Sequence, residues 1–204
     1  MQSLDLLDRS YPGARSESKR QILKCALALF NEHGMESTTI DLIRIHSQSS
    51  VGSIYHHFGN KEGVIAALYR SALDDQSKLR TDYLQDAKNL REGIFALVFS
   101  YVDWVVANPD WARFIFKARF YLVSSSHGEE LTKANASRNA KLKEWLEKHA
   151  GSEGLRAYPF ELIPSLLIGA SENYCRAWLS GRVKQSPEVY RQQLAQAAWL
   201  SVEG

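Results

Sequence analysis

Apolar residues recur at helical spacing in nearly every long segment, and no segment sustains the apolar–polar alternation of a half-buried strand. In residues 16–33, for example, Ile22, Ala26 and Leu29 lie on one stripe, and Gly34 follows at a position suited to end a helix. The pattern therefore predicts an all-α protein.

Two short helices are predicted after Gly34. The first follows Thr38, where Asp41 three residues later approximates a capping box, and it runs to about His46 and buries Ile40 and Ile43. The second has two turns, is capped by Ser49 or Ser50, and ends near residue 58. The turn between them is tight.

A long helix follows at residues 61 to about 84, and from residue 85 onward aromatic residues become dense and the helices lengthen. We place a domain boundary near the long helix, dividing the chain into a head of residues 14–62 and a body of residues 63–204. The predicted body helices cover about 89–107, 109–124, 129–150, 158–181 and 187–202.

Two short helices packed on a longer one form a helix-turn-helix, whose second helix can enter the major groove of DNA. Ser50, Gly52 and Ser53 are small enough to let the backbone approach DNA closely. Val51 can contact a thymine methyl group, and serine hydroxyls can bond bases or phosphates.

The flanks of this helix add groups that reach the DNA backbone. Tyr55, His56 and Lys61 stand at its far end, while Thr38 and Thr39 begin the preceding helix, whose free amides favour a phosphate. Thr38 can also serve only as a cap. The candidate DNA-binding residues are Thr38, Thr39, Ser49, Ser50, Val51, Ser53, Tyr55, His56 and Lys61.

Three motifs occur in order: G-x-x-x-T-T-I at residues 34–40, S-V-G-S-I-Y-H-H-F at 50–58 and G-N-K-E at 59–62. Together they resemble the TetR family of bacterial repressors over residues 16–66. The resemblance implies an all-helical homodimer with a three-helix DNA-binding head. It also implies a body that binds a small effector and dimerises through its last two long helices.

Four positions depart from that family's pattern. Gln48 stands where the inter-helix turn usually has glycine, and Ser49 replaces an apolar residue. Val51 replaces a frequent lysine or arginine, and Arg44 replaces a small residue. We therefore expect a less regular turn and the loss of one common phosphate contact.

The charge of the chain bears on the same hypothesis. The 204 residues carry a formal net charge of +2. Between residues 14 and 63, six Lys plus Arg minus five Asp plus Glu leave +1, which is weakly basic for a DNA-binding head. Protonated histidines in the head would add charge.

Other function classes find little support. The first 25 residues contain no apolar run of signal-peptide length, and the most apolar window, residues 93–107, is too short to span a membrane. Cys25 and Cys175 lie far apart, which favours neither a disulfide nor a zinc site. No phosphate-binding loop or nucleophile elbow occurs. We expect a cytoplasmic protein with no membrane association, no metal, no cofactor and no catalytic site.

Aromatic residues crowd the segment 95–121, where they form either a bulky core or a pocket between helices. The resemblance implies that some polar and aromatic body residues line an effector cavity. The candidates are Trp104, Trp111, Phe114, Tyr121, Glu172, Asn173 and Tyr174.

Residues 160–178 combine regularly spaced apolar residues with the small residues Gly169, Ala170 and Ser171, as at a helix–helix interface. With the last helix they form either a subunit interface or an internal helix pair. We predict a ligand-responsive transcriptional regulator, a repressor that a small-molecule effector releases from a palindromic double-stranded DNA operator. The alternative is a helical ligand-binding or enzymatic protein whose head contacts other proteins.

Overall fold

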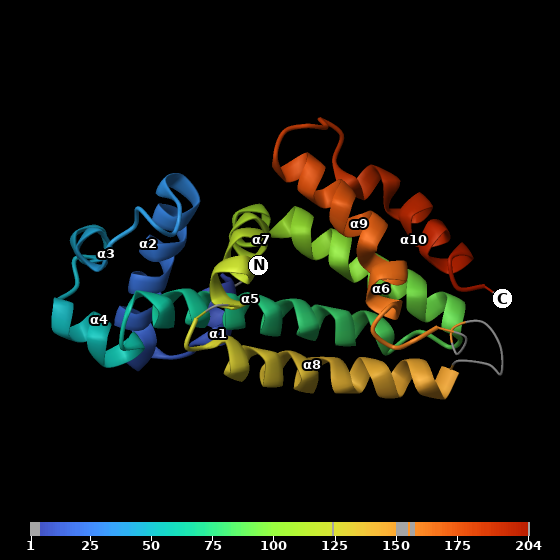
Figure 1. Ribbon diagram of the computed structural model, residues 1–204, viewed down its shortest axis with the longest axis horizontal. Helices are drawn as coiled ribbons and strands as arrows, with labels where there is room; N and C mark the ends of the chain where they lie inside the picture. Colours follow the sequence, from blue (N-terminus) through green and yellow to red (C-terminus); the bar gives the residue numbers. More distant parts are fainter. Residues whose placement is uncertain (1–4, 124, 150–154, 156–157, 204) are drawn as a thin grey trace. The chain divides into compact units, whose positions relative to one another are not determined.

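The computed structural model describes residues 5–123, 125–149, 155 and 158–203. These residues form helices and loops without a strand, which confirms the predicted all-α class (Figure 1). Within these ranges, no helix has the combination of length and hydropathy that crossing a bilayer requires.

The chain divides into two compact units. The N-terminal unit comprises Met1–Asp75 and Asp110–Asn135, and the C-terminal unit comprises Gln76–Pro109 and Ala136–Gly204. The sequence did not predict that a segment beyond residue 109 would belong with the N-terminal helices. The functional boundary at residue 62 stays a prediction.

The N-terminal unit is built around a core of helices that meet through aliphatic side chains, with Ile22, Ile43 and Ile54 fully buried. The ring of Phe30 lies 6.0 Å from that of Phe114 and joins the two segments of this unit. Its helices are α1 (Leu6–Ser10), η1 (Ala14–Ser16), α2 (Glu17–His33), α3 (Ile40–Ser47), α4 (Val51–Phe58), the first part of α5 (Lys61–Leu84), α7 (Pro109–Val123) and the first part of α8 (Gly128–His149).

Local caps explain where these helices begin. The Ser50 hydroxyl accepts a hydrogen bond from the Ser53 N–H at 3.1 Å and starts α4. The Asn60 side chain accepts from the Gly63 N–H at 2.8 Å at the start of α5. The predicted cap at Thr38 is wrong by one residue, because Thr39 caps α3.

Helices α4 and α5 approach each other closely where one ends and the other begins. A Cβ atom on Gly63 would lie 1.8 Å from the carbonyl oxygen of Phe58, so only glycine fits there. The backbone of the first turn of α5 therefore rests directly against the last carbonyl of α4.

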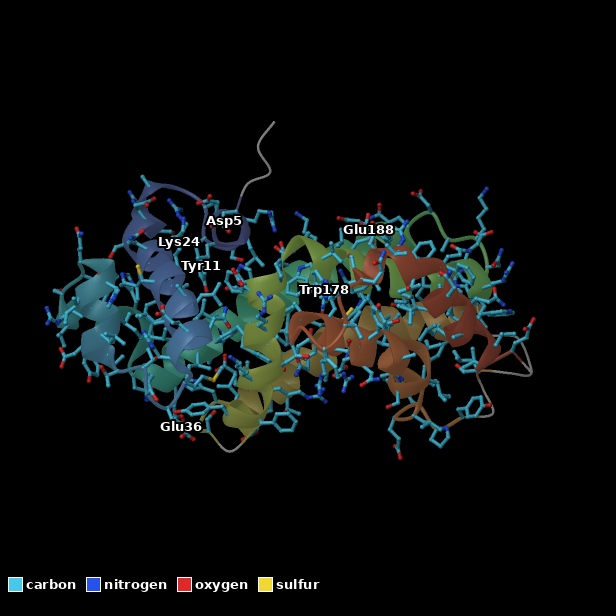
Figure 2. The ribbon with its side chains drawn as sticks, turned by 90° about the horizontal axis from the view of Figure 1, so that it is seen from above. Asp5, Tyr11, Lys24, Glu36, Trp178 and Glu188 are labelled. Carbon is cyan, nitrogen blue, oxygen red and sulfur yellow. The ribbon has the colours of Figure 1, made fainter. Side chains whose placement is uncertain are left out.

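The C-terminal unit packs α6 (Leu90–Ala107) against α9 (Ile163–Leu179) and α10 (Arg191–Leu200), with η3 (Pro187–Tyr190) between the last two. The apolar window at residues 93–107 lies within α6, which confirms the helix predicted at about 89–107 and buries most of its apolar residues. Helix α9 begins later than the predicted residue 158. Figure 2 shows Trp178 on α9 and Glu188 on η3 among the side chains of this unit.

Candidate functional site

Helix α4 presents one side to solvent. We call this surface the α4 face and define it as the exposed residues at the start and along the outer side of the helix. Val51 is 40% exposed and Tyr55 is 50% exposed, large fractions for apolar and aromatic residues. The α4 face consists of Ser50, Val51, Gly52, Tyr55 and His56.

The opposite side of α4 anchors the helix. Ile54 and Phe58, four residues apart, are buried and hold it against α2 and α3. At the edge of the α4 face, the hydroxyl of Ser53 lies 3.4 Å from that of Ser18 at the start of α2. The exposed residues of α4 are therefore Val51, Gly52, Tyr55 and His56, while Ser53 is half-buried.

The turn between α3 and α4 is regular, contrary to expectation. Gln48 adopts the left-handed conformation (φ 53°, ψ 31°), and its N–H donates to the carbonyl of Ile45. The Ser49 N–H donates to the carbonyl of Arg44 at 3.2 Å. These two bonds form a Schellman motif, which usually has glycine at its left-handed position. Gln48 thus reproduces the glycine turn at a cost in backbone strain.

Thr38 does not belong to the exposed surface. Its side chain is 0% exposed, and its hydroxyl donates to the carbonyl of Gly34 at 2.7 Å and lies 3.3 Å from that of Leu29. The side chain closes the loop after α2 and is unavailable to DNA. Its neighbour Thr39 is exposed and accepts the N–H of Leu42, which leaves its hydroxyl proton free to donate.

Lys61 is half-buried and performs a structural task. Its ammonium group donates to the carbonyl of Met35 at 2.8 Å and of Glu36 at 3.2 Å, so it ties the start of α5 to the loop after α2. Glu36 marks this loop in Figure 2. An ammonium group has three donors, so one remains for another acceptor. Contact between Lys61 and DNA stays a prediction.

Arg20 and Arg44, two further cations of the head, already interact with acceptors inside the protein. Arg20 donates to the carbonyl of Gly13 at 2.9 Å and pairs with Asp8 at 3.1 Å. Arg44 pairs with Asp41 at 3.2 Å. These ion pairs reduce the positive charge available to a polyanion, in line with the weakly basic composition of the head.

His57 adds little to that charge. Burial lowers the pKa of its imidazole, and the neighbouring charges of His56 and Lys19 lower this pKa further. A lowered pKa keeps a histidine neutral over more of the pH range. His57 is therefore a weaker source of positive charge than an ordinary histidine.

Ile45 was missed by the sequence pattern. It is 59% exposed on α3, whereas the predicted core residue Ile43 is fully buried and Ile40 is only half-buried. An exposed isoleucine beside the turn at Gln48 adds an apolar group to this side of the unit. Its spacing from the buried Ile43 is the signal that would have placed it outside the core.

The seven candidate effector residues do not form one group. Trp111, Phe114 and Tyr121 belong to the N-terminal unit, where Trp111 and Phe114 are core residues. The C-terminal unit contains the buried Trp104 and three more candidates on α9, which are Glu172, Asn173 and Tyr174. Glu172 pairs with Arg176, and the Tyr174 hydroxyl donates to the Gln185 carbonyl. Contact with an effector stays a prediction for each.

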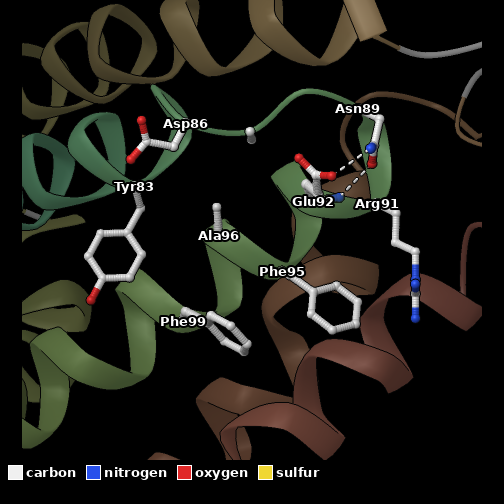
Figure 3. Close-up of a pocket in the computed structure, with 9 residues that line it drawn as sticks. Tyr83, Asp86, Asn89, Arg91, Glu92, Phe95, Ala96 and Phe99 are labelled. Carbon is white, nitrogen blue, oxygen red and sulfur yellow. Dashed lines mark hydrogen bonds between the residues drawn. The ribbon is translucent and has the colours of Figure 1, made fainter.

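The C-terminal unit also contains two cavities, and none of these seven residues lines either of them. The first, about 440 Å³, lies beside Phe95 and Phe99, with Tyr83 at its edge (Figure 3). The Tyr83 hydroxyl donates to Asp103 at 2.7 Å, and Asp103 also pairs with Arg191. The second cavity, about 370 Å³, lies between the ends of α5 and α8. In the described part of the chain, no three His, Cys, Asp or Glu side chains are grouped to hold a metal ion.

Comparison with known proteins links this geometry to a family. Residues 22–68, which contain most of α2, all of α3 and α4 and the start of α5, match the model of bacterial regulatory proteins of the tetR family. The chain is 40% identical over 55 residues to the HTH-type transcriptional repressor AcnR of Corynebacterium glutamicum. This matched segment covers 27% of this chain and 29% of AcnR. The chain is also 30% identical over 94 residues to the repressor KstR2 of Mycobacterium tuberculosis, covering 45% and 47%. The chain thus matches less than half the length of these relatives.

Similarity in fold extends further. A TetR family transcription regulator from Marinobacter aquaeolei superposes with a TM-score of 0.78 at 21% identity, covering 92% of this chain and 97% of that one. The solved KstR2 of Mycobacterium tuberculosis gives a TM-score of 0.67 at 20% identity, covering 91% and 95%. At such identities the similarity shows a shared fold.

Proposed function

Since residues 22–68 match the model of bacterial regulatory proteins of the tetR family, we propose that this chain is a transcriptional repressor that binds an operator as a homodimer. The observation that carries the proposal is the α4 face. It is exposed, it includes the small residues Ser50 and Gly52 and the hydroxyl groups of Ser50 and Tyr55, and the other side of the same helix is buried in the core.

In this proposal α4 enters the major groove. Val51 and Ser53 read base edges, Val51 through a thymine methyl group and Ser53 through its hydroxyl. Thr39, Tyr55 and the remaining donor of Lys61 contact phosphates and set the register of the helix on the duplex. The hydroxyls of Ser49 and Ser50 and the ring of His56 complete the contact surface.

We further propose that α9 and α10 form the dimer interface. One side of each helix packs on α6, and their other residues include exposed apolar and small side chains. Ala170 and Ala197 are exposed, and Leu200 is 59% exposed. A twofold dimer places two α4 helices about 34–36 Å apart, or a multiple of that, and requires a palindromic operator. A small-molecule effector that favours another spacing by about 1–3 kcal/mol would release the DNA.

The test is to select duplexes from a random pool with the purified protein and to titrate the selected duplex with variants. We expect a palindromic consensus, and we expect Val51→Ala and Ser53→Ala to change the preferred bases. Val189→Ala is the matched control, because Val189 is also exposed but lies on η3. A protein that selects no duplex, or selects the same bases with and without these side chains, contradicts the proposal.

A further inference from the structure

The second cavity is unusual in its charge. It is lined by residues from the ends of α5 and α8, all within the C-terminal unit. Among the described residues that line it there is no Asp or Glu. The lining residues that carry positive charge, or acquire it on protonation, are Arg80, Lys141, Lys148 and His149.

Arg80 is half-buried, whereas Lys141 and Lys148 are exposed. Its guanidinium donates to the carbonyl of Arg138 at 2.9 Å, to the Asn139 side chain at 3.2 Å and to the Ser77 hydroxyl at 3.2 Å. All three acceptors are neutral. Burial, and then the charge of Arg138, lower the pKa of the Arg80 guanidinium, as expected for a cation that no described carboxylate compensates.

The rest of the lining is apolar and well fixed. Leu84 and Leu142 contribute aliphatic surface, and Trp145 contributes its indole. The Trp145 ring stacks on that of His149, with centroids 4.0 Å apart. It also lies against the backbone of α6, because a Cβ atom on Gly93 would come within 1.9 Å of the indole.

We propose that this cavity binds a small organic anion, a carboxylate or a phosphate carried on an apolar body. Cations in a partly desolvated recess attract an anion more strongly than cations in open water. The planar guanidinium suits both carboxylate and phosphate, and the aliphatic and indole surfaces suit the apolar body. The binding of an anion in this cavity is independent of the proposed function. The further statement that this anion is the effector rests on the proposed function.

The first cavity, beside Phe95 and Phe99, has acidic as well as basic residues in its lining. Asp86 and Glu92 line it together with Arg91, so its charges are mixed (Figure 3). The two cavities therefore differ in the charge of the ligand that each favours. This contrast assigns the anion to the cavity at Arg80.

Isothermal titration calorimetry of the full chain without DNA tests the inference. The probes are 2-naphthoate, 2-naphthyl phosphate and the neutral 2-naphthalenemethanol. We expect at least one anion to bind about tenfold or more tightly than the neutral compound, which corresponds to one charge-assisted contact. The tighter of the two anions identifies the preferred headgroup.

Three variants locate the site. Arg80→Gln and Lys148→Gln are expected to weaken anion binding about tenfold each and to leave the neutral compound unaffected. Lys148 is exposed, so its variant stays informative if Arg80→Gln does not fold. Lys143→Gln is the matched control, because Lys143 lies on the same helix outside the cavity and pairs with Glu147.

Equal affinity for anions and the neutral compound overturns the inference, as does an anion affinity that falls equally in the Lys143 and Lys148 variants. Absence of binding by every probe at millimolar concentration overturns it as well. Since no DNA is present, these results are independent of operator binding. Either the anion site or the repressor function can therefore fail alone.

Discussion

Lys61 donates a hydrogen bond from its ammonium group to the carbonyl oxygen of Met35 at 2.8 Å, across 26 residues of sequence. A residue that we expect to contact a phosphate thus also fixes the loop between α2 and α3. The two roles use different donors of one group, and a single variant can test both.

Replacing Lys61 with methionine keeps the aliphatic stem and removes the ammonium group. We expect the free energy of unfolding to fall by about 1 kcal/mol, because two hydrogen bonds to carbonyls are lost at a half-exposed site. We also expect the salt dependence of operator binding to flatten by about one phosphate contact. Urea unfolding and operator titrations at several salt concentrations measure these effects.

Lys24→Met serves as the control for Lys61, because Lys24 is exposed on α2 and should affect stability little. A Lys61 variant that loses stability but keeps the wild-type salt slope would restrict Lys61 to its structural role.

Substitutions of Gly52 test whether the α4 face needs a residue without a side chain at this position. A Cβ atom at this position would have only the Ser50 hydroxyl, at 3.9 Å, within reach, so alanine fits the folded protein. We expect Gly52→Ala to raise the free energy of unfolding by about 0.5–1 kcal/mol, because glycine inside a helix is costly. Gly52→Leu should abolish operator binding, since its side chain would hold α4 away from the groove. A leucine variant that binds the operator as tightly as the wild type would refute the assignment of this face.

Gln48 occupies a backbone conformation that glycine adopts freely. We expect Gln48→Gly to stabilise the protein by up to about 1 kcal/mol, because relief of the left-handed strain exceeds the added entropy of the unfolded chain. Gln48→Val should destabilise it, since a β-branched residue resists this conformation. Thermal unfolding of the two variants measures the difference. A glycine variant less stable than the wild type would show that the Gln48 side chain has a role of its own.

The two cysteines are expected to differ in reactivity. Burial raises the pKa of the Cys175 thiol to about 12, and burial also raises the pKa of the half-buried Cys25. Only the thiolate reacts with iodoacetamide, so a raised pKa slows alkylation until the pH approaches that pKa. At about pH 8 we expect slow modification of Cys25 and almost none of Cys175. Mass spectrometry of the peptides, with denatured protein as the control, measures the rates; equal rates in the folded protein contradict this prediction.

The sequence predicted those features that depend on neighbouring residues. Ser50 and Asn60 start their helices through bonds to residues three positions later. Ser50 is one of the two caps predicted for its helix, and the predicted start of the long helix at residue 61 is confirmed. Thr38 and Thr39 show the limit of such signals. Either hydroxyl suits a helix cap, and only the fold decides that Thr38 turns inward toward Leu29.

Contacts between distant segments were beyond prediction from one sequence. The partners of Lys61 lie before α3, and the cavity at Arg80 takes its other cations from α8. Spacing along one helix gives no sign of either contact. The charge of that cavity therefore depends on the arrangement of α5 and α8 in the fold, which the sequence does not show.

The contact between Gly63 and the Phe58 carbonyl limits how the protein can move. Because these two backbones are already in contact, we expect α4 and the first turn of α5 to move as one piece. In the proposed response to a ligand, we therefore expect any pivot to lie farther along the chain than this joint.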